Sequence, residues 1–306
     1  APDGRSLIYA GERDGSWNIY EASLADDDEL YFFSATSIEE KAVIATDAEE
    51  FQPRYAPDGN KIAYLHDRHE IRVFDSESGQ TTVALPGDRF YSYSDGDHWF
   101  EWSPDSEWLV THLYSKGRVF YGEIGLVRAD GTGEVIDISN SGYDDGRPQF
   151  AMEGGAIIWA SARYGERSHG SWGSEDDVVG LFLTQDAHDR FRLSKEEYEL
   201  RKELEEKKDE KKEDEKKNDD EDAADDTDAD DDAESPEDGD ADEDGEDAEE
   251  DKPEPLKIEF EGLEDRRERL TINSSSLGDF AMSPEGDKLY YLASFEEGAD
   301  LWVHDF

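Results

Sequence analysis

A short turn sequence recurs through this 306-residue chain and limits its possible folds more than any other feature. Pro-Asp-Gly stands at 2–4 and 57–59, and the variants Pro-Asp-Ser and Pro-Glu-Gly stand at 104–106 and 284–286. A degenerate copy, Met-Glu-Gly-Gly, occupies 152–155. Proline fixes φ, aspartate can bond its own backbone and glycine supplies a positive φ. Each copy therefore predicts a tight turn.

The residues after each turn predict the rest of the repeat. Runs such as 61–65, 71–75 and 81–85 are short, rich in β-branched and aromatic residues, and bounded by Gly, Pro, Asp or Ser, as is typical of strands joined by hairpins. Four short antiparallel strands repeating every 40–55 residues form one propeller blade. The sequence therefore predicts an all-β fold, a β-propeller with four-stranded antiparallel blades.

Strand counting places the blade boundaries. The predicted blades are 1–46, 47–86, 87–139, 140–272 and 273–306, of which the first and last are incomplete. This is an open arc of four to five blades, and an open arc exposes two sheet edges. Because the chain also begins inside a repeat, at Ala1, we expect it to be part of a longer protein.

A highly acidic segment, residues 194–255, interrupts the fourth blade between a third strand at 178–183 and a fourth strand at 269–272. It divides the propeller into 1–193 and 256–306. Ser194 and Glu197 fit a capping box, which predicts a helix over 194–217 with Glu203 and Lys207 paired at i,i+4. Residues 218–252 are almost entirely Asp, Glu, Ala and Gly, a composition typical of disorder.

The same segment contains a spacing like that of a calcium-binding loop. The matching residues are Asp240, Asp242, Asp244, Gly245 and Asp251. The flanks are not helical, and Asp247 occupies the position that is usually apolar. Because this segment is so acidic, its composition alone is enough to produce such matches. We therefore expect no metal and no cofactor.

The formal charge of the chain is −52, of which 194–255 contribute −24 and the rest −28. Such a surface repels phosphate backbones and anionic headgroups, so nucleic acid and membrane surfaces are poor partners. No run of 18 apolar residues predicts a membrane span, and the absence of cysteine excludes disulfides and thiol catalysis.

Acidity spread over the folded part indicates adaptation to high salt, where screening relieves self-repulsion. We expect the melting temperature to rise steeply between low and molar KCl. Thermal unfolding followed by circular dichroism over a KCl series measures this, and a flat melting temperature would contradict it.

Catalytic signatures are missing from the sequence: it has no G-x-S-x-G, H-E-x-x-H, Walker or dinucleotide pattern. His66 to His69 read as a solvated hairpin turn rather than a metal site. The most unusual stretch, 163–174, joins two strands and brings cationic and aromatic residues into an acidic chain: Arg163, Arg167, His169 and Trp172. Two interpretations stay open. The loop binds peptide carboxylates or a neighbouring domain, or its own Trp and Ser merely order it.

Several non-repeat pieces carry a family resemblance. They are FQPRYAPDG (51–59), YSYSDGDHWFEWSPD (91–105), SHGSWGS (168–174), LSKEEYEL (193–200), ERLTINSS (268–275) and KLYYLA (288–293). Together they resemble the tricorn-protease-like serine peptidases of bacteria, over nearly the whole chain except about 205–252. The resemblance implies a parent with two propellers, a PDZ-like domain and a protease core that carries the catalytic residues. No catalytic position of that family maps onto this sequence.

The resemblance implies a non-catalytic propeller that controls the access of peptides or unfolded proteins to the core. Two alternatives stay open: a TolB-like interaction propeller without an enzyme, and a dipeptidyl-peptidase-type propeller before an α/β-hydrolase. The sequence after Phe306 would separate these three. Bacterial relatives are often exported and archaeal ones cytosolic, so both the periplasm and the cytoplasm are compatible with the sequence.

Overall fold

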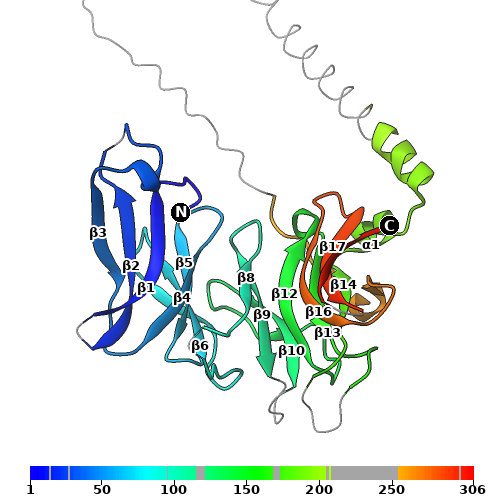
Figure 1. The fold of residues 1–306 in the computed structure, drawn as a ribbon, viewed down its shortest axis with the longest axis horizontal. Coiled ribbons are helices and arrows are strands. Elements are labelled where there is room, and N and C mark those ends of the chain that lie inside the picture. Colours follow the sequence, from blue (N-terminus) through cyan, green and yellow to red (C-terminus); the bar gives the residue numbers. More distant parts are fainter. Residues whose placement is uncertain are drawn as a thin grey trace, which may run out of the picture. The chain divides into compact units, whose positions relative to one another are not determined.

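The computed structural model describes residues 1–13, 15–26, 28–94, 96–114, 121–167, 173–204, 207, 254–295 and 298–306. The chain forms two compact units, Ala1–His188 with Pro253–Phe306, and Asp189–Lys252. The first unit is built from strands (Figure 1). None of the helices in the described ranges is long and apolar enough to cross a membrane.

In the described residues of the first unit, five antiparallel sheets follow one another in the order in which the chain makes them. The first and last have three strands and the others four. The first sheet comprises β1 (Ser6–Arg13), β2 (Ser16–Leu24) and β3 (Ile38–Ile44), and the second comprises β4 (Glu50–Tyr55), β5 (Lys61–His66), β6 (Glu70–Asp75) and β7 (Thr81–Leu85). The third comprises β8 (Phe100–Trp102), β9 (Trp108–Tyr114), β10 (Gly122–Arg128) and β11 (Ile136–Asp137), and the fourth comprises β12 (Asp145–Ala151), β13 (Ala156–Ser161), β14 (Asp177–Phe182) and β15 (Arg267–Arg269). The fifth comprises β16 (Ser276–Met282), β17 (Lys288–Ser294) and β18 (Asp300–Asp305). This is the predicted all-β, propeller-type fold.

The repeated turn has the predicted geometry. The residue at the glycine position donates its N–H to the carbonyl three residues earlier, at 2.9–3.0 Å for Gly4, Gly59, Ser106 and Gly286. All four have a positive φ, between 60° and 79°. Ser106 adopts this strained conformation without being a glycine. The turn is therefore specified by the whole tetrapeptide and its two flanking strands, not by glycine alone.

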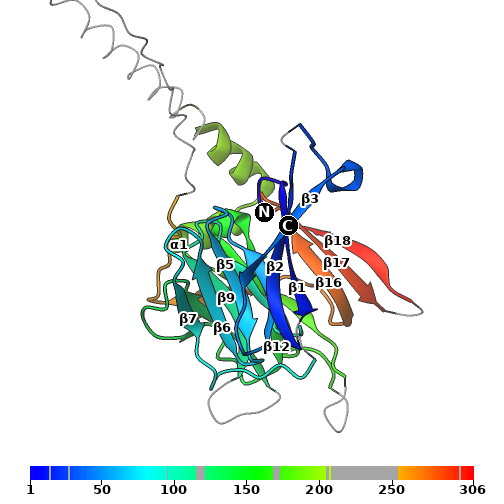
Figure 2. The ribbon, with the colours of Figure 1, turned by 90° about the vertical axis from the view of Figure 1, so that its left-hand side faces the viewer.

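Apolar clusters between neighbouring sheets form the core. Ile19 and Ile44 of the first sheet pack against Ile62 and Tyr64 of the second. The second and third sheets share one cluster, and the third and fourth share another that includes Trp159. Each of the first four sheets thus buries apolar side chains against its neighbour along the chain, as blades of a propeller do. Figure 2 shows how the strands of these sheets are arranged.

The fourth sheet confirms that the acidic segment lies between a third and a fourth strand. β14 pairs with β15, so that Val179 stands opposite Arg269. The predicted fourth strand, 269–272, was placed two to three residues too late. At Val178 the N–H bonds the Thr271 hydroxyl at 3.2 Å, and that hydroxyl donates to Asp177 at 2.6 Å. These side-chain bonds replace the ladder after Leu270 and end the strand.

The local predictions have different outcomes. The capping box forms, since the Glu197 carboxylate accepts from the Ser194 N–H at 3.0 Å and residues 195–204 are helical. Glu203 and Lys207 lie 3.6 Å apart, as expected. The calcium-like pattern lies outside the described residues, and the limits 194–255 stay a prediction. The predicted hairpin turn lies at 67–69, between β5 and β6, but the prediction that His66 is solvated was wrong, since its Nδ1 lies 3.0 Å from the fully buried Glu50 carboxylate.

Candidate functional site

The connection between β13 and β14 carries the unusual cationic stretch. Its two arms run antiparallel, because Arg167 bridges to Ser174 and the Glu175 N–H donates to the Glu166 carbonyl at 2.9 Å. At Gly165 an added Cβ would stand 1.9 Å from the Glu175 carbonyl oxygen, so only glycine allows this approach. The two described arms, up to 167 and from 173, are therefore held against each other.

Arg163, Tyr164 and Arg167 of this connection contact an aromatic ring and an arginine from other parts of the chain. Arg163 and Arg167 place their guanidinium carbons 6.0 and 4.6 Å from the centre of the Tyr143 ring. Arg163 also lies 5.6 Å from the Tyr164 ring, and Arg269 lies 5.2 Å from the same ring. Cation–π contacts of this kind hold guanidinium groups without neutralising them. We call these five residues the arginine–tyrosine cluster.

Among the described residues, only Arg269 of the three arginines in the cluster pairs with a carboxylate. Arg269 pairs with Asp177 at 2.8 Å, and the Asp177 side chain is fully buried. Asp177 also accepts from the Ser274 hydroxyl at 2.7 Å. Arg163 and Arg167 are exposed and form no ion pair with a carboxylate of the described part of the chain. Their positive charge therefore faces solvent.

A buried polar layer lies beside the cluster. Asp145, at the start of β12, is 1% exposed and accepts from the Ser141 hydroxyl at 2.6 Å. Burial raises the pKa of the Asp145 carboxyl. Arg267 donates to the Ile138 and Ser139 carbonyls at 3.0 and 2.7 Å and lies over the Trp159 ring. These contacts fix the blade end on which the exposed arginines stand.

The structure brings together two of the four residues named from the sequence. Arg163 and Arg167 share the Tyr143 ring, while His169 and Trp172 lie outside the described residues. The sequence analysis missed Tyr143, Tyr164 and Arg269. Tyr164 follows Arg163 directly in the sequence, and this position next to a predicted site residue could have identified it. Tyr143 lies before β12 and Arg269 lies in β15, so no local signal points to them.

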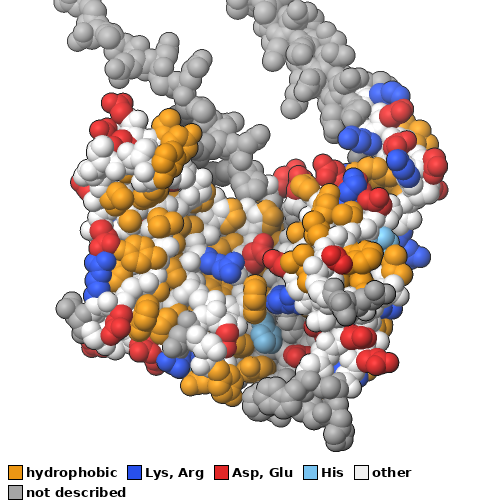
Figure 3. Space-filling view, in the orientation of Figure 1, with side chains coloured by type: hydrophobic (Ala, Val, Ile, Leu, Met, Phe, Trp, Pro, Cys, Tyr) orange, Lys and Arg blue, Asp and Glu red, His pale blue; other side chains and the backbone are white. Residues whose placement is uncertain are grey.

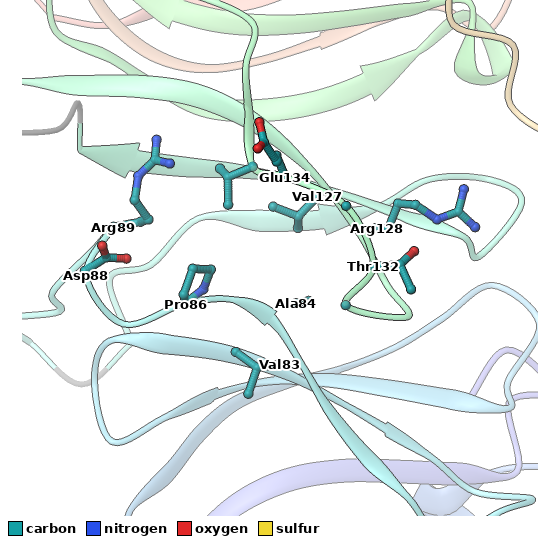
Figure 4. Close-up of a pocket in the computed structure, with 12 residues that line it drawn as sticks. Val83, Ala84, Pro86, Asp88, Arg89, Val127, Arg128, Thr132 and Glu134 are labelled. Carbon is teal, nitrogen blue, oxygen red and sulfur yellow. The ribbon is translucent and has the colours of Figure 1, made fainter.

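A hollow of about 550 Å³ lies between β7 and the β10–β11 connection (Figure 4). Val83, Ala84 and Val127 supply apolar surface, and charges of both signs stand among the lining residues. Gly131 touches β7 so closely that an added Cβ would stand 2.7 Å from the Val83 carbonyl oxygen. The hollow is a gap between two blades, and its mixed charges favour no particular ligand.

A second hollow, of about 430 Å³, is formed by the first strands of several sheets. Ile8, Tyr55 and Trp102 line it together with Arg54 and Glu101. Burial raises the pKa of Glu101 to about 7, although Arg54 acts in the opposite direction. Within the described ranges no three His, Asp or Glu side chains are grouped so that they could hold a metal ion.

Comparisons with known proteins support the fold. No family model and no curated protein sequence matches the chain. Among solved structures it is similar to the tricorn protease, with a TM-score of 0.57 and 10% identity over 98% of this chain and 24% of that one. TolB from Acinetobacter baumannii is similar with a TM-score of 0.48 and 13% identity over 100% of this chain and 51% of that one. The chain thus spans about a quarter of the tricorn protease and about half of TolB. At such identities the likeness to the tricorn protease shows a propeller-type fold and nothing further.

Proposed function

We propose that this chain is a non-catalytic propeller portion of a tricorn-like serine peptidase and that it guides peptides toward a protease core elsewhere in the parent. The arginine–tyrosine cluster carries this proposal. Two exposed guanidinium groups, which form no ion pair with a carboxylate of the residues that the structure describes, are unusual in a chain of net charge −52. The sequence resemblance and the propeller-type fold support the same function.

The cluster suits the carboxyl end of a peptide. Arg163 and Arg167 approach Tyr143 together, so one carboxylate can accept hydrogen bonds from both guanidinium groups. Tyr164 is 45% exposed and offers an aromatic face to an apolar side chain of the same peptide. Such a cluster would recognise a chain by its free carboxyl end. Short peptides, of which this end is a large part, are therefore the expected ligands.

Replacing both arginines with glutamine, as Arg163→Gln with Arg167→Gln, is expected to weaken binding of peptides with a free carboxyl terminus by about tenfold or more, because charge-assisted hydrogen bonds are lost. Fluorescence anisotropy with labelled heptapeptides measures the affinity at fixed salt. Peptide amides of the same sequence should bind the native chain as weakly as the free acids bind the double variant.

Arg128→Gln is the matched control. Arg128 is also partly exposed but already contacts Asp130 at 3.3 Å, and its loss should leave peptide affinity unchanged. Equal binding of acids and amides by the native chain would contradict the proposed carboxylate site. Activity of the purified parent toward the same peptides, abolished by a serine-peptidase inhibitor, would test the attached core separately.

A further inference from the structure

The connection between β2 and β3 exposes large apolar side chains. Leu30 is 67% exposed, Tyr31 59% and Phe33 89%, and Ile38 at the start of β3 is 52% exposed. Figure 3 shows apolar surface gathered at this end of the first sheet, and Figure 2 shows the connection projecting from the strands. We call Leu30, Tyr31 and Phe33 the aromatic tip. Isolated exposed apolar residues are normal, but a contiguous group marks an interaction site.

Hydrogen bonds hold the tip in place. Phe32–Ser34 form a 3₁₀ helix, in which the Ser34 N–H donates to the Tyr31 carbonyl at 3.1 Å. The Tyr31 and Phe33 rings stack with centroids 5.5 Å apart. The tip is therefore ordered although its side chains face solvent.

The base of the connection is fixed as well. Arg5, before β1, donates to the Glu29 and Asp26 carbonyls at 3.2 Å. The Glu29 carboxylate accepts from the Thr36 N–H at 2.7 Å and so closes the loop. Because the loop is preorganised, binding through the tip would cost little conformational entropy.

The charge around the tip limits its partner. No Lys, Arg or His occurs between residues 14 and 40, whereas Asp26, Asp28 and Glu39 are exposed beside the tip. An anionic membrane surface would be repelled by these carboxylates. A surface with an apolar pocket and a cationic rim would be attracted, since electrostatic complementarity directs association.

We propose that the aromatic tip is a docking element for a partner protein whose surface has an apolar pocket rimmed by lysine or arginine. Phe33 enters the pocket, Tyr31 and Leu30 cover its edge, and Asp28 and Glu39 face the basic rim. This does not depend on peptide binding at the arginine–tyrosine cluster, which lies on a different sheet.

In the test, the photoreactive amino acid p-benzoylphenylalanine replaces Phe33 in the full chain, and cross-linking is done inside the cells that naturally produce this protein. The matched control carries it at Phe260, another exposed phenylalanine, which is 49% exposed. We expect one discrete adduct from position 33 and none of that mass from position 260. Cross-linked peptides should map to an apolar surface flanked by Lys or Arg.

The partner protein identified by cross-linking is then purified on its own. Its affinity for the native chain is compared with its affinity for three variants. Phe33→Ser should weaken binding at least tenfold, whereas Phe260→Ser should leave it unchanged. Reversing the charge at both carboxylates, with Asp28→Lys and Glu39→Lys, should also weaken binding and reduce its dependence on salt. Equal labelling from both positions, adducts of two copies of this chain only, or binding of the tip to phosphatidylglycerol vesicles instead of a protein would each overturn the proposal.

Discussion

Replacing Arg266 with methionine is expected to lower the free energy of unfolding by about 3–5 kcal/mol, because it removes a buried cation from four main-chain carbonyls at once. Arg266 is 3% exposed. It donates to the Phe182 and Glu261 carbonyls at 3.0 Å each, to the Leu183 carbonyl at 3.4 Å, and also to the Glu259 carbonyl.

These contacts join the end of β14 to the segment that returns after the acidic insertion. The Glu259 N–H adds a further bond to the Leu183 carbonyl at 2.9 Å. Methionine fills a similar volume but offers no donor, so the carbonyls would stay buried and unpaired. The loss should therefore exceed that of an ordinary surface substitution.

Urea unfolding followed by tryptophan fluorescence measures the change. Arg128→Met, at a partly exposed arginine of β10, is the control and should change the free energy of unfolding by less than about 0.5 kcal/mol. If Arg266→Met lowered the free energy of unfolding no more than Arg128→Met, the segment that follows the acidic insertion would be held by its apolar contacts alone.

Much of the fold could be predicted because its signals are local. The Pro-Asp-Gly turn and its flanking strands lie within a few residues of one another, and each copy repeats the same chemistry. The degenerate copy makes the same hydrogen bond, since the Gly155 N–H donates to the Met152 carbonyl at 2.8 Å, although the positive φ there falls on Met152, Glu153 and Gly154. Five repeats in phase therefore located all five sheets, although no helix was predicted at α1 (Gln185–Phe191).

The candidate site was harder to predict because its contacts are not local. Tyr143 meets Arg167 from a different connection, and Arg269 reaches Tyr164 only after the insertion returns. His66 likewise pairs with Glu50 across a strand pair, which a reading of the 66–69 neighbourhood alone does not reveal. Composition identified an unusual cationic loop, whereas the partners of each arginine depend on how the strands pair.

Glu101 offers the sharpest test of electrostatics within the folded unit. It lies between Phe100 and Trp102 on β8, both buried, and burial raises its pKa from 4.5 to about 7. Arg54 and a main-chain N–H at Phe150 favour the ionised form but do not overcome burial. Between about pH 4.5 and 7 the folded chain therefore keeps a proton at Glu101 that the unfolded chain has released. The contribution of Glu101 to the free energy of unfolding is therefore fully present below that pH range and is lost as the pH rises through it.

Glu101→Gln should abolish this loss, because glutamine resembles the protonated acid in size and stays neutral at every pH. At pH 8 the variant should be more stable than the native chain by up to about 3 kcal/mol, since one pKa unit corresponds to about 1.4 kcal/mol. At pH 4 the two should be nearly equal. Urea unfolding of both chains at each pH gives the difference, in which the contributions of all other titrating groups cancel.

Glu107→Gln, at a more exposed carboxylate paired with Lys61, is the control and should show no comparable rise with pH. A difference for Glu101→Gln that stays flat from pH 4 to 8 would show that water or Arg54 solvates the carboxylate fully, and that the hollow beside it is open to solvent.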